Sequence, residues 1–187
     1  MKVIKKILIS LLVLGSFSLA SSSDMFLLEN AKADFDGKNG EIFIGTPIKI
    51  IKDIDDKMVL VEISGVSFGD ELYSSKGKAL LVAKKDGSFV EKNKASELGF
   101  VKVEAKIEKS YLTKNVKEVW EEYEEFYYDM CTSCHAGHRA VTHTMLEWEA
   151  ILQTMKGFAQ LNDKEENYIL RYLKANSKDG FYEKRAD

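Results

Sequence analysis

The spacing of the apolar residues changes near Thr113, and that change constrains the fold more than any other feature of this chain. Between residues 41 and 108 the apolar residues form short runs rich in valine and isoleucine, bounded by glycine, proline and aspartate. Beyond Thr113 they recur at intervals of three and four residues, which is the spacing of one side of a helix. The sequence therefore predicts an α+β protein, with a strand-rich half followed by a helical half.

The strand-rich half, residues 21–112, is expected to form a small SH3-like β-barrel. Its last segment, residues 100–107, alternates strictly between apolar and polar side chains, so one face lies on a core and the other faces water. About five short strands in so few residues suit a small, partly closed barrel. These strands are expected at residues 42–44, 48–51, 58–63, 79–83 and 100–107.

The helical half, residues 113–187, is expected to contain three helices. The first carries an apolar and aromatic side that runs directly into Cys131. The second begins with a capping box formed by Thr144 and Glu147, and the third begins at Asn162. Three short helices bury little apolar surface by themselves, so a large apolar cofactor among them would supply the missing interior.

The segment Cys131-Thr132-Ser133-Cys134-His135 has the C-x-x-C-H spacing of a c-type haem attachment site. Two thiols three positions apart reach the two vinyl groups on one edge of a porphyrin, and the following imidazole then points at the iron. We therefore expect one covalent haem c, attached through Cys131 and Cys134, with His135 as the proximal ligand. Such a domain is a three-helix cytochrome c-type haem domain.

The two cysteines also permit a redox dithiol, a zinc site or a disulfide. A thioredoxin-type redox motif needs a strand before the first cysteine, whereas a helix is expected here. A zinc site could use Cys131, Cys134, His138 and His143, although His135 would then have no role. A disulfide would close only a tight ring and would link no distant parts of the chain. All three possibilities remain open at the level of the sequence.

The sixth ligand of the iron is expected to be Met155. This residue lies on the apolar side of the second helix together with Trp148 and Ile151, which are expected to line the haem pocket. A methionine on such a stripe is more often part of a core than a ligand. His143 and Met145 remain possible ligands if the loop after the attachment motif wraps around the haem edge. A Met/His iron would carry single electrons and would have no substrate of its own.

The first 20 residues have the order of a secretory signal peptide. Three lysines precede an apolar run that is too short to span a bilayer, and small residues precede Ala20, where we expect cleavage. Removing the three lysines from 27 basic residues leaves 24 against 30 acidic residues, a net charge of −6. We therefore expect a soluble periplasmic protein without a later membrane span, and an acidic balance that argues against binding nucleic acid.

The mature sequence resembles the monohaem C-terminal domain of the pentahaem c-type cytochromes that donate electrons to trimethylamine N-oxide and sulfoxide reductases, which are molybdoenzymes. By this resemblance His135 would be the proximal ligand, Met155 the distal ligand, and the strand-rich half a docking or positioning module. The segments that carry the resemblance are Gly45-Thr46-Pro47-Ile48-Lys49-Ile50-Ile51, Val59-Leu60-Val61-Glu62-Ile63-Ser64-Gly65, Cys131 to His135, Trp148 to Met155, and Tyr172-Leu173.

The resemblance has one clear departure. The fused relatives carry a membrane-anchored multihaem segment that oxidises quinol, whereas this sequence has a single attachment motif. We therefore expect an electron-transfer protein, not an enzyme, that receives electrons from a separate quinol-oxidising cytochrome and passes them to a terminal reductase. The alternatives are a haem-based sensor with an open iron position and a structural zinc-binding module.

Overall fold

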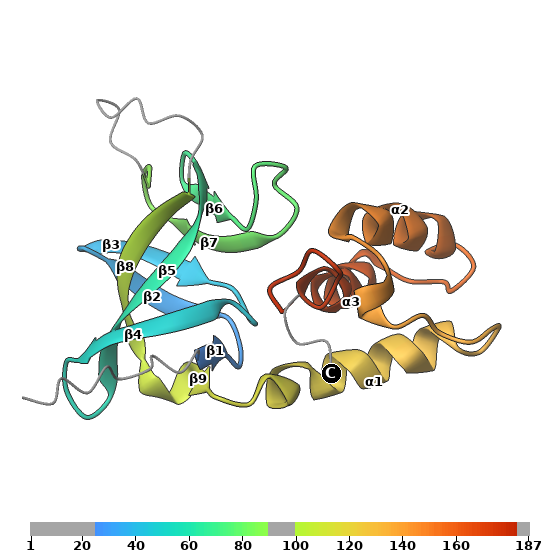
Figure 1. Cartoon of the computed structure of the whole chain (residues 1–187), viewed down its shortest axis with the longest axis horizontal. Helices are drawn as coiled ribbons and strands as arrows, with labels where there is room; N and C mark the ends of the chain where they lie inside the picture. The colour runs from blue at the N-terminus through green and yellow to red at the C-terminus, as the bar shows by residue number, and fades with distance from the viewer. Residues whose placement is uncertain (1–24, 90–99, 183–187) are drawn as a thin grey trace, which may run out of the picture.

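The computed structural model describes residues 25–89 and 100–182, and it has the expected α+β composition. The strands form a barrel and the helices pack beside it, as Figure 1 shows. The signal peptide expected over residues 1–20 lies outside the described residues. Within the described ranges, every helix falls short of the length and hydropathy that crossing a bilayer requires.

In the described residues the strands are β1 Met25–Leu27, β2 Ala31–Phe35, β3 Lys38–Ile42, β4 Pro47–Asp53, β5 Met58–Phe68, β6 Glu71–Tyr73, β7 Leu81–Lys85, β8 Phe100–Glu108 and β9 Leu112–Thr113. These nine strands form one sheet in the order β6-β7-β3-β2-β8-β5-β4-β1-β9. Strand β5 also pairs with β6, so six strands from β5 around to β8 form a closed circuit of hydrogen bonds. Strands β4, β1 and β9 extend the sheet from β5.

The expected number of about five strands was wrong, because β1, β2, β6 and β9 were missed. Three of these strands have only two or three residues, which is too short to show a period. Strand β2 alternates correctly, but alanine fills two of its three buried positions. The expectation of a small barrel is confirmed, and its SH3-like type stays a prediction.

The turn between β2 and β3 shows how the sequence sets the register of the barrel. Phe35 pairs with Lys38, so only Asp36 and Gly37 connect the two strands. Both have positive φ angles, of 54° and 79°. Such a two-residue turn matches the twist of its strands, and Asp-Gly is one of the pairs that adopt it most easily. The Asp34 carboxylate also accepts a hydrogen bond from the Gly37 amide at 2.5 Å.

Among the residues that the structure describes, three α-helices follow the barrel, as expected: α1 Val116–Cys131, α2 Met145–Met155 and α3 Asp163–Ala175. Short 3₁₀ turns cover Lys109–Tyr111 and Ala140–Thr142. Both predicted helix starts are confirmed. Thr144 and Glu147 form a capping box on α2, and Asn162 and Glu165 form one on α3. Each box satisfies amide groups that the first helical turn leaves without partners.

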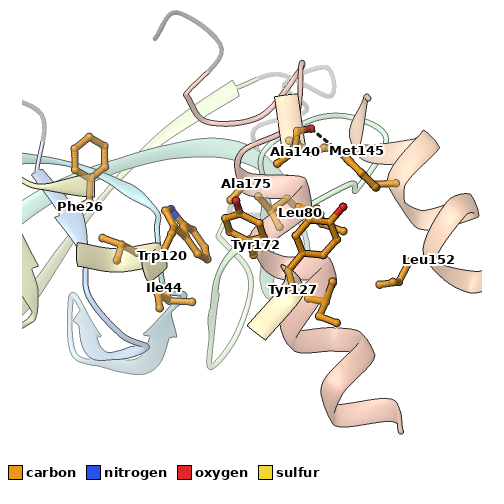
Figure 2. Packing of buried hydrophobic residues seen from close by; sticks show 14 of the residues in the cluster. Phe26, Ile44, Leu80, Trp120, Tyr127, Ala140, Met145, Leu152, Tyr172 and Ala175 are labelled. Atoms are coloured by element: carbon orange, nitrogen blue, oxygen red, sulfur yellow. Dashed lines mark hydrogen bonds between the residues drawn. The ribbon is translucent and has the colours of Figure 1, made fainter. Parts of the chain in front are cut away.

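The helices and the barrel share an apolar cluster. Figure 2 shows Phe26 of β1 and Ile44 near Trp120 of α1, with Tyr172 and Tyr127 continuing the cluster among the helices. The Trp120 ring lies directly where a side chain on Gly45 would be, so only glycine fits there. The Gly45 φ angle of +77° requires the same residue.

Polar contacts complete this junction. Arg171 of α3 donates hydrogen bonds from Nε and Nη2 to the Ile44 carbonyl, at 3.2 and 2.5 Å, and from Nη1 to the Leu81 carbonyl, at 2.5 Å. Burial lowers the pKa of Arg171 to about 10, so the guanidinium stays charged at neutral pH. Tyr182 donates to the Gly45 carbonyl at 2.5 Å and accepts from the Trp120 indole at 3.2 Å. We call these contacts of residues 44, 45, 81, 120, 171 and 182 the barrel–helix seam.

Candidate functional site

A cavity of about 380 Å³ opens among the three helices and the loop that follows α1. Its size lies within the range of small-molecule and cofactor pockets. Most of its wall is apolar, and the cysteine and histidine side chains of the motif lie along it. The lining residues are Tyr127, Met130, Cys131, Ser133, Cys134, His135, His138, Trp148, Ile151, Leu152, Met155, Phe158, Ala159 and Leu173.

The cavity brings together all six residues that the sequence singled out for the site. Cys131 is the last residue of α1, and Met155 is the last residue of α2, so both helices end at this cavity. Cys134 and His135 enter from the loop between the two helices, while Trp148 and Ile151 enter from α2. This placement leaves their roles toward a haem as predictions.

The two cysteines are free thiols in this structure. Burial raises the pKa of the Cys131 thiol. Cys131 also lies at the C-terminal end of α1, where the helix dipole disfavours a thiolate, whereas reactive redox cysteines lie at helix N-termini. The structure therefore gives no support to a thioredoxin-type role for this pair.

The His135 imidazole is exposed, and its Nδ1 lies 2.9 Å from the carbonyl oxygen of Ala136. A carbonyl only accepts, so this contact places the ring proton on Nδ1 and leaves the lone pair on Nε2. A histidine ligand usually has this arrangement, in which one ring nitrogen is held by a carbonyl and the other is available to a metal.

Three hydrogen bonds hold the loop between His135 and α2. The Tyr127 hydroxyl donates to the His138 carbonyl at 2.8 Å, and burial raises the pKa of this phenol to about 12. The Trp148 indole donates to the Ala140 carbonyl at 2.6 Å. The amide of Lys178 donates to the His143 carbonyl at 2.9 Å. Tyr127 and Trp148, which line the cavity, thus also position the loop that follows His135.

The other two candidate ligands lie away from the cavity wall. Met145 is buried, with its sulfur 4.0 Å from the Ser74 hydroxyl of the barrel side, and its amide donates to Asp179. His143 packs edge-on against Trp148, with ring centroids 4.8 Å apart. Neither lines the cavity, whereas Met155 does. The geometry thus favours Met155 among the three residues that the sequence left open.

The zinc alternative finds no matching cluster. In the part of the chain that the structure describes, no three His, Cys, Asp or Glu side chains come close enough together to hold a metal ion. Cys131, Cys134, His138 and His143 therefore do not form the four-ligand set that a structural zinc site needs.

Several lining residues were not predicted from the sequence as site residues. Tyr127, Leu152 and Leu173 carry a signal, because they lie on the apolar sides of their helices. Phe158 and Ala159 carry none, because they follow the end of α2. The Phe158 side chain is 80% exposed, although it forms part of the wall.

The residues around the cavity fit a covalently attached haem. Two free thiols and an imidazole lie at the edge of a largely apolar space, and a thioether sulfur lines the same space from the end of α2. A haem needs thiols for its covalent attachment, nitrogen or sulfur ligands for its iron, and an apolar wall around its flat ring. The fit rests on the donor set and on the apolar lining.

Comparison with curated proteins finds similarity to the cytochrome c-type protein TorC of Escherichia coli strain K12, with 25% identity over 172 residues. The match covers 84% of this chain and 44% of TorC, and the TorC of Escherichia coli O157:H7 gives the same values. The chain thus spans less than half the length of these curated relatives. No family model and no solved structure matches it significantly. The similarity supports a relationship to c-type cytochromes that resemble TorC.

Proposed function

We propose that this chain is a periplasmic monohaem c-type cytochrome that transfers single electrons between two other proteins. The donor is a quinol-oxidising cytochrome, and the acceptor is a terminal reductase, of the molybdoenzyme class that reduces N-oxides or S-oxides. The chain itself is not an enzyme. The attachment motif, the cavity and the similarity to TorC support this proposal together.

One observation carries the proposal. Cys131, Cys134 and His135 line the same apolar cavity as Met155, which comes from the far end of another helix. The motif is local in sequence, but the meeting of its residues with Met155 is not. A zinc site or a redox dithiol would need neither the methionine sulfur nor an apolar wall of this size.

The residues have separate roles in the proposed site. Cys131 and Cys134 would form the two thioether links, and His135 would bind the iron through Nε2. Met155 would supply the second protein ligand of the iron, and Trp148 and Ile151 would enclose the porphyrin. When bound, haem c supplies one-electron chemistry at its iron.

The proposed partners come from the relatives. The sequence resembles cytochromes that feed trimethylamine N-oxide and sulfoxide reductases, and 84% of the chain matches TorC, a cytochrome c-type protein. The periplasmic location comes from the signal peptide expected over residues 1–20. Co-expression with candidate reductases, followed by measuring which of them reoxidises the reduced cytochrome, tests the acceptor.

The attachment itself is tested by exporting the full chain from cells with working cytochrome c maturation machinery. We expect a Soret absorption, a pyridine haemochrome spectrum of the c type, and an intact mass that includes one haem. Colourless protein under these conditions overturns the proposal. The C131A/C134A double variant, exported in parallel, is expected to carry no covalent haem.

Replacing Met155 with alanine tests the distal ligand. Met155→Ala is expected to remove the weak sulfur-to-iron absorption band and to lower the reduction potential by on the order of 0.1 V, because thioether sulfur favours the ferrous state. His143→Ala is the matched control and should leave both properties unchanged. If His143 is the ligand, the unaltered protein lacks the sulfur-to-iron band and His143→Ala, not Met155→Ala, changes the reduction potential. Rapid carbon monoxide binding by the unaltered protein would indicate an open iron position, as in a sensor.

A further inference from the structure

Phe158 has the highest fractional exposure of the large apolar residues that the structure describes as exposed. Its side chain is 80% exposed, although burying a phenyl group against an apolar partner is favourable. Nevertheless the residue forms part of the cavity wall, three positions after Met155. The exposed ring and the predicted distal ligand therefore lie at the same cavity.

Hydrogen bonds and ion pairs fix the segment that carries Phe158. The amide of Ala159 donates to the Met155 carbonyl at 2.9 Å, and the amide of Leu161 donates to the Lys156 carbonyl at 3.1 Å. The Lys156 ammonium pairs with Asp163 at 2.5 Å and Glu166 at 2.7 Å, both at the start of α3. The backbone that carries the ring is therefore held between α2 and α3.

The direction of the chain after Phe158 depends on Gln160. Its φ angle of +54° lies in the left-handed region, which a residue with a side chain rarely adopts. The turn brings Leu161 into the core, where it is only 5% exposed. Phe158, two positions before this turn, lines the cavity.

We propose that the Phe158 ring shields the Met155 side of the cavity, so that water and small ligands reach the bound iron there only past this ring. This inference rests on the proposed function, because a haem in the cavity is the apolar group against which the ring would pack. The shield acts on access to the iron and on the stability of the sulfur-to-iron bond. Phe158 is in this sense a positioning residue for Met155.

The test compares Phe158→Ala with Leu146→Ala in the haem-loaded protein. Leu146 is a suitable control, because its side chain is 74% exposed on α2 and does not line the cavity. The measurement is the rate at which cyanide binds to the oxidised protein. We expect Phe158→Ala to bind cyanide about tenfold faster. This factor corresponds to a barrier to binding that is lower by about 1.4 kcal/mol. Leu146→Ala should bind at the rate of the unaltered protein.

A conservative variant and a spectrum separate shielding from general damage. Phe158→Leu keeps an apolar cover and is expected to bind cyanide at a rate close to that of the unaltered protein. Equal rates in Phe158→Ala and Leu146→Ala, with haem attached in both, overturn the shield and leave the cytochrome assignment standing. Absence of a c-type haemochrome spectrum in the unaltered protein overturns both proposals, and this readout is independent of cyanide.

Discussion

The barrel and the helices differ in what completes their cores. In the barrel, Ile42, Val59, Val61 and Ile107 have no exposed surface, and a closed circuit of strand hydrogen bonds surrounds them. Among the helices, apolar side chains instead form the wall of a cavity of about 380 Å³, and the nearby Phe158 ring is largely exposed. The side chains of the barrel fill its interior, whereas the helical half leaves space for a further group.

This difference follows from how the two halves are built. Closing a sheet on itself pairs the backbone groups of its strands and leaves side chains to fill a small interior. Three short helices offer each other only narrow apolar sides, so their contact leaves room between them. We therefore expect the barrel to keep its structure without a cofactor and the helical half to depend on one.

The largest expected effect comes from removing the two thiols. In C131A/C134A, which would carry no covalent haem, we expect the helices to lose roughly 3–5 kcal/mol of stability, like the loss of a large buried aromatic side chain. Hydrogen exchange measured for each segment should show fast exchange in α1, α2 and α3 and retained protection in β5 and β8. Equal loss of protection in both halves would contradict the difference between them.

A smaller effect is expected at the barrel–helix seam. Arg171→Met removes three hydrogen bonds from a buried guanidinium to two barrel carbonyls, which should cost about 2–3 kcal/mol in denaturant unfolding. Arg139→Met, at an exposed position, is the control and should change little. If the two halves then unfold in two separate steps, the hydrogen bonds of Arg171 are what couples their unfolding. A single unchanged transition would mean that the apolar cluster suffices.

The smallest expected effect concerns the capping box of α2. The Thr144 amide donates to Glu147 at 2.7 Å, which holds the pKa of this carboxyl below its ordinary value of 4.5. A lowered pKa in the folded state contributes stability above pH 4.5, and that contribution is lost as the pH falls through the lowered value. Glu147→Gln should therefore flatten the acid dependence of helix melting, measured by circular dichroism. Glu121→Gln, at an exposed position on α1, should leave it unchanged.

The features that could be predicted from the sequence are local ones. The capping boxes of α2 and α3 involve residues three positions apart, and the attachment motif spans five residues. Their physical causes lie within one helical turn or one loop, so no knowledge of the fold is needed. The position of Met155 at the cavity could also be predicted in this way, because the apolar stripe that it shares with Trp148 and Ile151 is a property of one helix.

The features that escaped prediction depend on distant parts of the chain. Arg171 bonds a carbonyl 127 positions away, and nothing near it in sequence distinguishes it from a solvated arginine. Gly45 reads as a turn residue, and its contact with Trp120 depends on how α1 packs against the barrel. Phe158 follows a helix end, where apolar spacing no longer indicates a direction.

The barrel–helix seam has a consequence for any encounter with another protein. Arg171 precedes Tyr172 and Leu173 on α3, and Leu173 forms part of the cavity wall, so one helix connects the barrel turn to the cavity. A protein that binds the barrel would therefore meet the cavity in one fixed orientation, because the two halves do not have to find their relative orientation first.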